Sequence, residues 1–378
     1  MRTEGLRVLV VDDSPVIRLA VRGILLMDPR IASVELASDG RVALQKLESF
    51  DADVVTLDVE MPGMDGLSAL RQIMKRFPRP VVMLSAHTFV GAEKSIRALE
   101  WGAVDVVRKP SNAVSMEEMG SELRSRVIAI AERRRQAPSL WRAWSRVQGR
   151  RTEPTSPVRT SVAAPSMLPR LVPMQELVAI GASTGGTEAL HYLLSSLPAD
   201  FPAPIVIVQH MPEAFTGAFA SRLNELCRLE VKESSARDML LPGRALVARG
   251  NRHLVVVMER GCGLVCSRDF AKVNHQRPSI DVLFESVAAL REVCSVGVLL
   301  TGMGRDGAEG LLAMRNAGAV TIAQDEASSV VYGMPKAAVD LGAAQCIADL
   351  RAIPGLLQAA LRTHDKKNAR EGARHVLG

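Results

Sequence analysis

The chain has 378 residues, of which 47% are hydrophobic and 3% aromatic. This length favours two domains, and the hydrophobic fraction excludes a largely disordered chain. The net charge of +6 points to a nucleic-acid binder, but the excess of basic over acidic residues lies in one short segment, residues 132–170. Residues 1–131 carry 17 basic and 18 acidic groups, residues 132–170 carry nine Arg and two Glu, and residues 171–378 are neutral. With so few aromatic side chains for base stacking, we expect no nucleic-acid partner.

Neither a membrane helix nor an export signal is visible in the chain. No stretch reaches the roughly 18 uninterrupted apolar residues that a membrane helix needs. The N-terminal segment runs directly into a strand-like run, without the pattern of a signal peptide. We therefore expect a cytoplasmic protein without membrane insertion.

The first half alternates short β-branched runs with amphipathic helical patterns. The expected strands are Arg7–Val11, Ser33–Ala37, Asp53–Leu57, Pro80–Leu84 and Val104–Val107. Strands separated by helices predict a parallel sheet covered by helices on both faces. We expect this first α/β domain to span residues 1–131.

Residues 132–174 lack an apolar period and are rich in Arg, Pro, Ser and Thr, which is typical of a linker. Trp141 and Trp144 lie inside it. Two interpretations are open: a contact that docks the linker on a domain, or a recognition element for a partner. At the other end of the chain, residues 366–378 form a polar tail.

A second α/β alternation fills residues 175–365. Its expected strands are Leu177–Gly181, Pro204–Val208, Ala245–Ala248, His253–Met258, Leu264–Ser267, Val296–Leu300 and Val320–Ala323. Closely spaced strands between Val231 and Asp269 predict a β-hairpin insertion in a mostly parallel, doubly wound sheet.

Five polar side chains follow predicted strands of the first domain: Asp12, Asp13, Asp58, Ser85 and Lys109. Parallel strands bring their carboxyl ends to one edge, so we expect these groups in one crevice. Three carboxylates together favour a bound Mg²⁺, and the hydroxyl and the lysine suit phosphoryl oxygens. The chemistry indicated is phosphoryl transfer to Asp58.

The motifs VVDDSP, TLDVEMPGMDG, LSA and KP, read in this order over residues 5–128, resemble the response-regulator receiver domain. The resemblance implies a flavodoxin-like fold and phosphorylation of Asp58 by a histidine kinase. It implies Mg²⁺ held by Asp13, Asp58 and the Glu60 carbonyl with Asp12 assisting, and phosphate contacts from Ser85 and Lys109. Val106 replaces the aromatic residue that many receivers carry three positions before the lysine, so the switch is expected to act near Ser85 and Trp101.

In the second domain, the sequence GASTGG follows a strand and precedes a helix, which fits a nucleophile at a strand-to-helix turn. Ser183 is then the expected nucleophile. A glycine-rich phosphate-binding loop is the alternative, although the motif lacks both the dinucleotide fingerprint and the Walker lysine.

A serine nucleophile needs a base and a carboxylate that orients the base. His210 ends the neighbouring predicted strand and is preferred over the other candidates, which are His191, His253 and His275. Asp306 lies in the glycine-rich turn after a further strand and is preferred over Asp281 and Asp325. The backbone N–H of Met303 is a candidate oxyanion donor.

The motifs GASTGG, VQHMP, RPSIDVLF, LTGMGRDGAEG and QDEASSVVYGMPKAA resemble the catalytic domain of the CheB family of protein-glutamate methylesterases over residues 175–362. The resemblance implies Ser183 as nucleophile, His210 as base, Asp306 as orienting acid, Met303 as oxyanion donor and Thr184 lining the site. It implies a metal-free carboxylic ester hydrolase that demethylates glutamate esters and deamidates glutamines on chemoreceptor helices. Its phosphodonor would be a histidine kinase of the chemotaxis type.

Two other functions remain to be weighed against this enzyme. A receiver-controlled transcription regulator needs a helix-turn-helix after the linker, but the chain continues as an α/β pattern. A non-catalytic adaptor is disfavoured because all three triad residues are present. We hypothesise that the unphosphorylated receiver covers the esterase site and that phosphorylation releases it.

Overall fold

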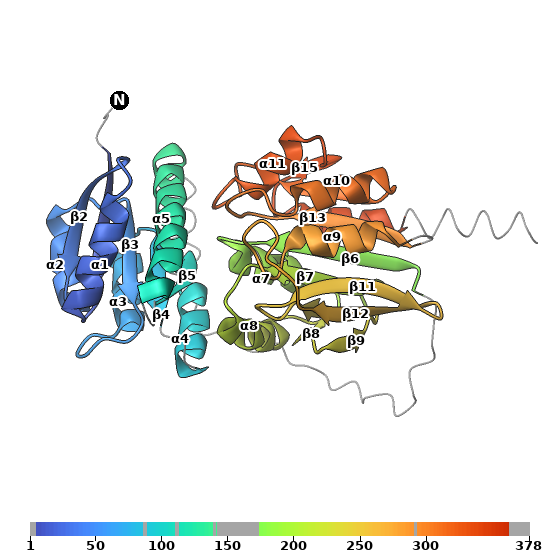
Figure 1. Ribbon diagram of the computed structural model, residues 1–378, viewed down its shortest axis with the longest axis horizontal. Helices are drawn as coiled ribbons and strands as arrows, with labels where there is room; N and C mark the ends of the chain where they lie inside the picture. The colour runs from blue at the N-terminus through green and yellow to red at the C-terminus, as the bar shows by residue number, and fades with distance from the viewer. Residues whose placement is uncertain are drawn as a thin grey trace, which may run out of the picture. The chain divides into compact units, whose positions relative to one another are not determined.

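The computed structural model describes residues 5–85, 89–109, 113–138, 141, 174–290 and 293–362. The chain divides into two compact units between Pro154 and Thr155 (Figure 1). Most of the expected linker, including Trp144, and the expected tail lie outside the described residues.

A five-stranded parallel sheet forms the centre of the first unit, with strand order β2-β1-β3-β4-β5. Its strands are β1 (Leu6–Val11), β2 (Ile31–Ala37), β3 (Val54–Asp58), β4 (Val81–Ser85) and β5 (Asp105–Arg108). All five expected strands are confirmed within two residues at each end. The order is that of flavodoxin-like folds, as expected.

Four helices connect these strands, namely α1 (Pro15–Leu26), α2 (Gly40–Ser49), α3 (Gly66–Arg76) and α4 (Phe89–Glu100), and α5 (Ala113–Gln136) follows β5. Helices α1 and α5 pack together on one face, and α2, α3 and α4 follow each other on the other face (Figure 1). Ser14, Asp39 and Asp65 begin three of these helices because their side-chain oxygens accept otherwise unpaired N–H groups of the first turn.

Helix α5 continues to Gln136, past residue 132 where the linker was expected to begin. Arg134 Nη1 lies 3.1 Å from Asp53 Oδ1, and Arg135 Nη2 lies 2.5 Å from Asp53 Oδ2. These two arginines therefore belong to the packed receiver and not to a solvated linker, which corrects the sequence interpretation. Trp141 is only 7% exposed, which favours the interpretation of that residue as a packing contact.

A seven-stranded parallel sheet with strand order β15-β14-β13-β6-β7-β10-β8 forms the second unit, beside a separate three-stranded antiparallel sheet ordered β11-β12-β9. The strands are β6 (Glu176–Ala182), β7 (Ile205–Gln209), β8 (Glu230–Glu233), β9 (Arg237–Met239), β10 (Arg244–Val247), β11 (His253–Glu259), β12 (Cys262–Arg268), β13 (Cys294–Leu299), β14 (Val320–Gln324) and β15 (Cys346–Ala348). The expected hairpin exists as β11 and β12, but it pairs with β9 instead of joining the parallel sheet.

The labelled helices of this unit are α7 (Gly186–Ser195), α8 (Glu213–Leu226), α9 (Ile280–Ala288), α10 (Ala308–Asn316) and α11 (Met334–Asp340), and residues 353–362 are helical as well. Helices α9 and α10 pack against each other above the sheet in Figure 1, and α7 and α8 contact each other on the other side. From β6 the sheet grows through β7, β10 and β8 in one direction and through β13, β14 and β15 in the other. The reversal beside β6 is where ligands bind in open α/β sheets.

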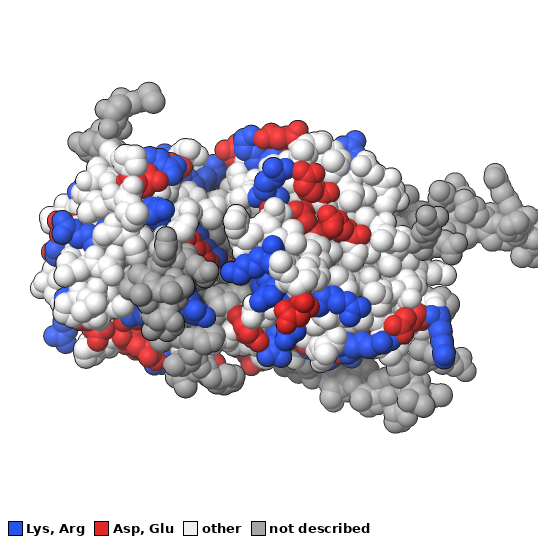
Figure 2. Space-filling view, in the orientation of Figure 1, with Lys and Arg blue, Asp and Glu red and all other residues white. Residues whose placement is uncertain are grey.

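Charges of both signs are interspersed on the face of the molecule in view (Figure 2). Ion pairs of the second unit include Arg252 with Asp269 at 2.8 Å and Arg237 with Glu259. Within the part of the chain that the structure describes, no helix has the length and apolar character needed to cross a membrane.

Candidate active site and phosphorylation site

Ser183 follows the last residue of β6 at the sharp turn into α7. Its backbone N–H donates to the Thr301 carbonyl at 3.0 Å, and its carbonyl accepts the Gly186 N–H at 2.7 Å. Ser183 as a whole is 6% exposed. This strand-to-helix turn has the placement of a serine nucleophile in α/β hydrolases. The next residue, Thr184, is buried, and its carbonyl accepts the Thr301 hydroxyl at 3.0 Å.

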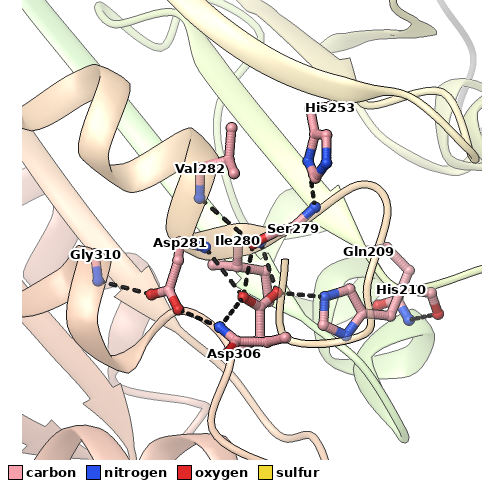
Figure 3. Close-up of polar contacts among 10 residues, drawn as sticks. Gln209, His210, His253, Ser279, Ile280, Asp281, Val282, Asp306 and Gly310 are labelled. Carbon is pink, nitrogen blue, oxygen red and sulfur yellow. Dashed lines mark hydrogen bonds and ion pairs between the residues drawn. The ribbon is translucent and has the colours of Figure 1, made fainter. Parts of the chain in front are cut away.

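His210 follows β7, the strand next to β6, and Asp306 follows β13, the strand on the other side of β6. His210 Nε2 lies 2.8 Å from Asp306 Oδ2, and both side chains are buried (Figure 3). Three neighbouring strand ends thus carry the three residues expected from the sequence. The backbone places His210 beside the nucleophile strand, since its N–H donates to the Ala182 carbonyl at 3.0 Å.

The tautomer of His210 follows from the charge of Asp306. Burial alone would raise the pKa of Asp306, but its hydrogen bonds, first of all with His210, lower it to about 2. At neutral pH the carboxylate can only accept, so His210 Nε2 carries the proton. In the neutral ring the lone pair is then on Nδ1, which is buried without a hydrogen-bond partner among the described residues. Nδ1 is therefore the nitrogen available to act as a base.

The N-terminus of α9 surrounds Asp306 with hydrogen-bond donors (Figure 3). Asp306 Oδ2 accepts the Ile280 N–H at 2.7 Å, and Oδ1 accepts the Ser279 hydroxyl at 2.7 Å. Asn274 Nδ2 adds a third side-chain donor, 3.0 Å from Oδ1. A helix N-terminus stabilises negative charge, so this contact fixes Asp306 as a carboxylate.

Sequence reasoning missed Ser279 and Asn274. A usable signal existed for Ser279, because Ser before an apolar helical run predicts an N-cap, and its Oγ indeed accepts the Val282 N–H. Asn274 gave no such signal. It occupies a tight turn with His275 in which both residues have positive φ, and that turn brings its amide to Asp306.

The rival carboxylates have other contacts. Asp281 Oδ1 accepts the Gly310 N–H at 2.7 Å and Oδ2 accepts Asn274 Nδ2 at 2.6 Å. Burial, followed by the charge of Asp306, raises the pKa of Asp281 to about 6. Asp325 holds its own turn by accepting the Ser328 N–H at 3.0 Å.

The other candidate histidines also have different environments. His253 Nδ1 accepts the Ser279 N–H at 3.3 Å, and its ring stacks on Phe270 with 4.2 Å between centroids. His253 thus supports the residue that holds Asp306. His191 lies on α7 with Nδ1 3.9 Å from Glu188, and His275 is exposed.

The loop after β13 approaches the nucleophile closely. A Cβ atom added to Gly302 would lie 2.7 Å from Ser183 Cβ, so only glycine fits there. The Gly302 carbonyl accepts the Gly333 N–H at 3.1 Å and the Met334 N–H at 2.9 Å, at the start of α11. Because a trans peptide directs its C=O and N–H oppositely, the Met303 N–H points away from α11. This geometry is compatible with an oxyanion donor at Met303.

The first unit brings its predicted residues together at the carboxyl end of the sheet. Carboxylate oxygens of Asp12, Asp13 and Asp58 lie within 4.8 Å of one another. Lys109 Nζ lies 2.6 Å from Asp12 Oδ2 and 2.7 Å from Asp58 Oδ2. Burial, with the charge of Asp12 adding to it, raises the pKa of Asp58 although Lys109 opposes this. The all-oxygen donor set fits Mg²⁺.

Ser85 ends β4 beside this cluster. Its carbonyl accepts the Lys109 N–H at 2.8 Å, and its hydroxyl donates to the Gly91 carbonyl at 3.3 Å. The Glu60 N–H donates to Asp58 Oδ1 at 3.2 Å, and its side chain pairs with Lys94. Val106 is buried in β5.

Comparisons with known proteins agree with both halves of this picture. The response regulator receiver domain model matches residues 8–120, and the CheB methylesterase model matches residues 178–357. "Protein-glutamate methylesterase/protein-glutamine glutaminase 2" of Koribacter versatilis is 43% identical over 359 residues, covering 94% of this chain and 96% of that protein. The chain belongs to the CheB methylesterase family. A further family member, "Protein-glutamate methylesterase/protein-glutamine glutaminase 1" of Anaeromyxobacter dehalogenans, is 48% identical and covers 89% of this chain and 94% of its own.

Among solved structures, the CheB methylesterase catalytic domain of Thermotoga maritima is 37% identical, with a TM-score of 0.47, and covers 48% of this chain and 97% of its own. CheB family membership identifies the protein as a hydrolase that acts on esters and amides, with a receiver domain that contains a phosphorylation site. The expected family and fold class are thereby confirmed.

Proposed function

We propose that the protein hydrolyses glutamate γ-methyl esters and deamidates glutamine side chains of chemoreceptors through a Ser183–His210–Asp306 triad. The observation that carries the proposal is the 2.8 Å contact between His210 and Asp306, which leaves the buried Nδ1 as a base at the strand end next to Ser183. The names of the relatives supply the substrate class.

The reaction uses only groups of this chain and water. Ser183 Oγ attacks the ester or amide carbonyl while its proton moves to His210 Nδ1. The Met303 N–H stabilises the tetrahedral oxyanion, which collapses as His210 protonates the leaving methanol or ammonia. Water, deprotonated by His210, then attacks the acyl-enzyme and releases the glutamate carboxylate and the Ser183 hydroxyl. Thr184 lines this site.

Asp58 controls the esterase as the acceptor of a phosphoryl group from a chemotaxis-type histidine kinase. Asp12, Asp13, Asp58 and the Glu60 carbonyl would hold Mg²⁺, and the ion would supply positive charge for the phosphoryl group. Ser85 and Lys109 contact the phosphoryl oxygens. The arrangement of Lys109 between two carboxylates supports this role, because the lysine already faces the acceptor oxygen.

The domain limits that follow are a receiver that extends to Gln136 at the end of α5, a basic linker up to residue 174, a catalytic domain over 175–365 and a polar tail over 366–378. The two family matches, at residues 8–120 and 178–357, support these limits, and the division between Pro154 and Thr155 lies inside the linker. We place the protein in the cytoplasm, where its kinase and the receptor helices meet it.

Methanol release from synthetic peptides that contain glutamyl γ-methyl ester tests the activity. We expect release by the wild type and about 10⁴-fold or more loss of kcat in Ser183→Ala. Ser195→Ala, on the last residue of α7, is a matched control that should retain the wild-type rate. Hydrolysis by Ser183→Ala at the wild-type rate would contradict the triad.

A small-molecule phosphodonor with Mg²⁺ tests control by Asp58. We expect the donor to increase the rate of methanol release by the wild type and to leave the rate of Asp58→Asn unchanged. An equal increase in both proteins would exclude Asp58 as the controlling site.

A further inference from the structure

The side chain of Gln209 lies buried between the strand ends that carry Ser183 and His210. It is the last residue of β7 and is 2% exposed. Its Nε2 group donates to the Ser183 carbonyl at 2.9 Å and to the His210 carbonyl at 3.2 Å. One amide therefore binds the backbone of both the proposed nucleophile and the proposed base, next to His210 in Figure 3.

Two donors hold the Ser183 carbonyl, because the Gly186 N–H binds it as well, at 2.7 Å. The Ala182 carbonyl, one residue earlier, accepts the His210 N–H at 3.0 Å. The peptide planes on both sides of Ser183 are thus fixed relative to β7. Since these planes determine where the Cα–Cβ bond points, they fix the Cβ atom that carries the Ser183 hydroxyl and the axis about which the hydroxyl rotates.

The oxygen of the same amide group lowers the folding stability of the domain. Gln209 Oε1 is buried and has no hydrogen-bond partner among the described residues. It packs against the first turn of α7, where a Cβ atom on Gly186 would lie 2.3 Å away. A buried acceptor without a partner destabilises a fold, whereas an apolar side chain of the same length would avoid this cost. Packing alone does not account for an amide at this position.

We propose that Gln209 is a positioning residue that sets the serine hydroxyl and the imidazole in register by holding the two backbone carbonyls. The proposal rests on the hydrolase function given above. Gln209 acts through Ser183 and His210 and needs no contact with substrate. A displacement of about 1 Å between reacting groups can cost about 10²-fold in rate, which sets the size of the expected effect.

Gln209→Glu provides the test. It keeps the shape, but the ionised carboxylate presents only acceptors to two carbonyl oxygens, whereas the protonated acid regains one O–H donor. We expect kcat for the peptide ester to fall about 10²-fold at pH 8, with KM within about twofold of wild type. As the pH is lowered towards 5.5, the ratio of variant to wild-type kcat should rise, because the carboxyl is protonated.

Gln209→Met is the matched variant. It has no donor, so we expect a similar loss of kcat with no recovery at low pH. Thermal melting reports how much of each variant is folded.

The rate at which a fluorophosphonate labels Ser183 separates this proposal from the proposed substrate. Labelling needs the serine and its base but no glutamyl ester, so it remains informative if the wild type does not hydrolyse the peptide. We expect about 10²-fold slower labelling of both Gln209 variants. If folded Gln209→Met labels at the wild-type rate and keeps its kcat within twofold, Gln209 has no positioning role. A loss of kcat that only matches the loss of folded protein would also overturn the proposal.

Discussion

The hydrogen bonds of Asp306 predict how Asp306→Asn would fail. An amide has one oxygen, so its NH₂ group must take the place of either Oδ1 or Oδ2. Oδ1 accepts hydrogen bonds from Ser279, Asn274 and the Asp281 N–H. Oδ2 accepts hydrogen bonds from His210 and the Ile280 N–H. Three donors against two keep the oxygen at the Oδ1 position. The NH₂ group then faces His210 Nε2, which must accept, and the ring proton moves to Nδ1. The lone pair that should take the serine proton is lost.

The magnitude follows from this change of tautomer. A triad with its orienting carboxylate replaced by an amide loses about 10⁴-fold in kcat, which corresponds to about 5.4 kcal/mol at 1.36 kcal/mol per tenfold. Methanol release from the peptide ester measures the loss, and ¹⁵N resonances of the imidazole report which nitrogen is protonated. Thermal melting confirms that the variant is folded.

Asp281→Asn is the matched control, since Asp281 is equally buried beside Asp306 but its oxygens accept from Gly310 and Asn274. We expect it to keep the Nε2–H tautomer of His210. The reasoning is refuted if folded Asp306→Asn retains kcat within tenfold of wild type. It is equally refuted if the activity is lost while Nε2 stays protonated.

Three further predictions concern Asp281, Lys109 and Gly302. Burial above all raises the pKa of Asp281 from 3.8 to about 6. The contribution of this group to folding stability is therefore complete below pH 4 and is lost as the pH rises through 6. Denaturant melts should therefore show Asp281→Asn losing less stability relative to wild type at pH 7 than at pH 4. Lys109→Ala removes the ammonium that faces Asp58, and gel-resolved phosphorylation from a small phosphodonor should fall at least tenfold; unchanged labelling would contradict this. Gly302→Ala places a methyl group 2.7 Å from Ser183 Cβ, so kcat should fall about 10²-fold, and a wild-type kcat would show that the loop yields.

Much of this architecture could be predicted, because apolar runs indicate the buried strands and the polar residues at their ends indicate the site. The strand of Val54–Asp58 is fully buried and ends on a carboxylate, and the same pattern recurs before Ser183 and His210. Since parallel strands end at one edge, these polar residues were expected together, and the structure places them so. Burial and topology are the parts of the fold that a single sequence records best.

The missed parts depend on contacts that local patterns do not show. Strand β8 reads Glu-Val-Lys-Glu and becomes a strand only by pairing with β10 at the sheet edge. Asn274 contacts Asp306, 32 residues away in the sequence, because it lies in a tight turn of two residues with positive φ. Asn and His tolerate this conformation, but their presence in a sequence does not predict it. The sequence does not distinguish Gln209 from other residues at strand ends, because only the tertiary structure brings the Ser183 carbonyl to its amide.

The hydroxyl of Ser85 has one proton, and that proton is already engaged with the Gly91 carbonyl at 3.3 Å, in the first turn of α4. If Asp58 is phosphorylated as we propose, a phosphoryl oxygen on it would compete for the same proton. The Gly91 carbonyl does not depend on it, because the Ser95 hydroxyl also donates to this oxygen at the shorter distance of 2.6 Å. After transfer of the Ser85 proton, the Gly91 carbonyl would still accept a hydrogen bond, so the stability of α4 would change little. The exchange would nevertheless break the hydrogen bond that joins the first turn of α4 to the end of β4.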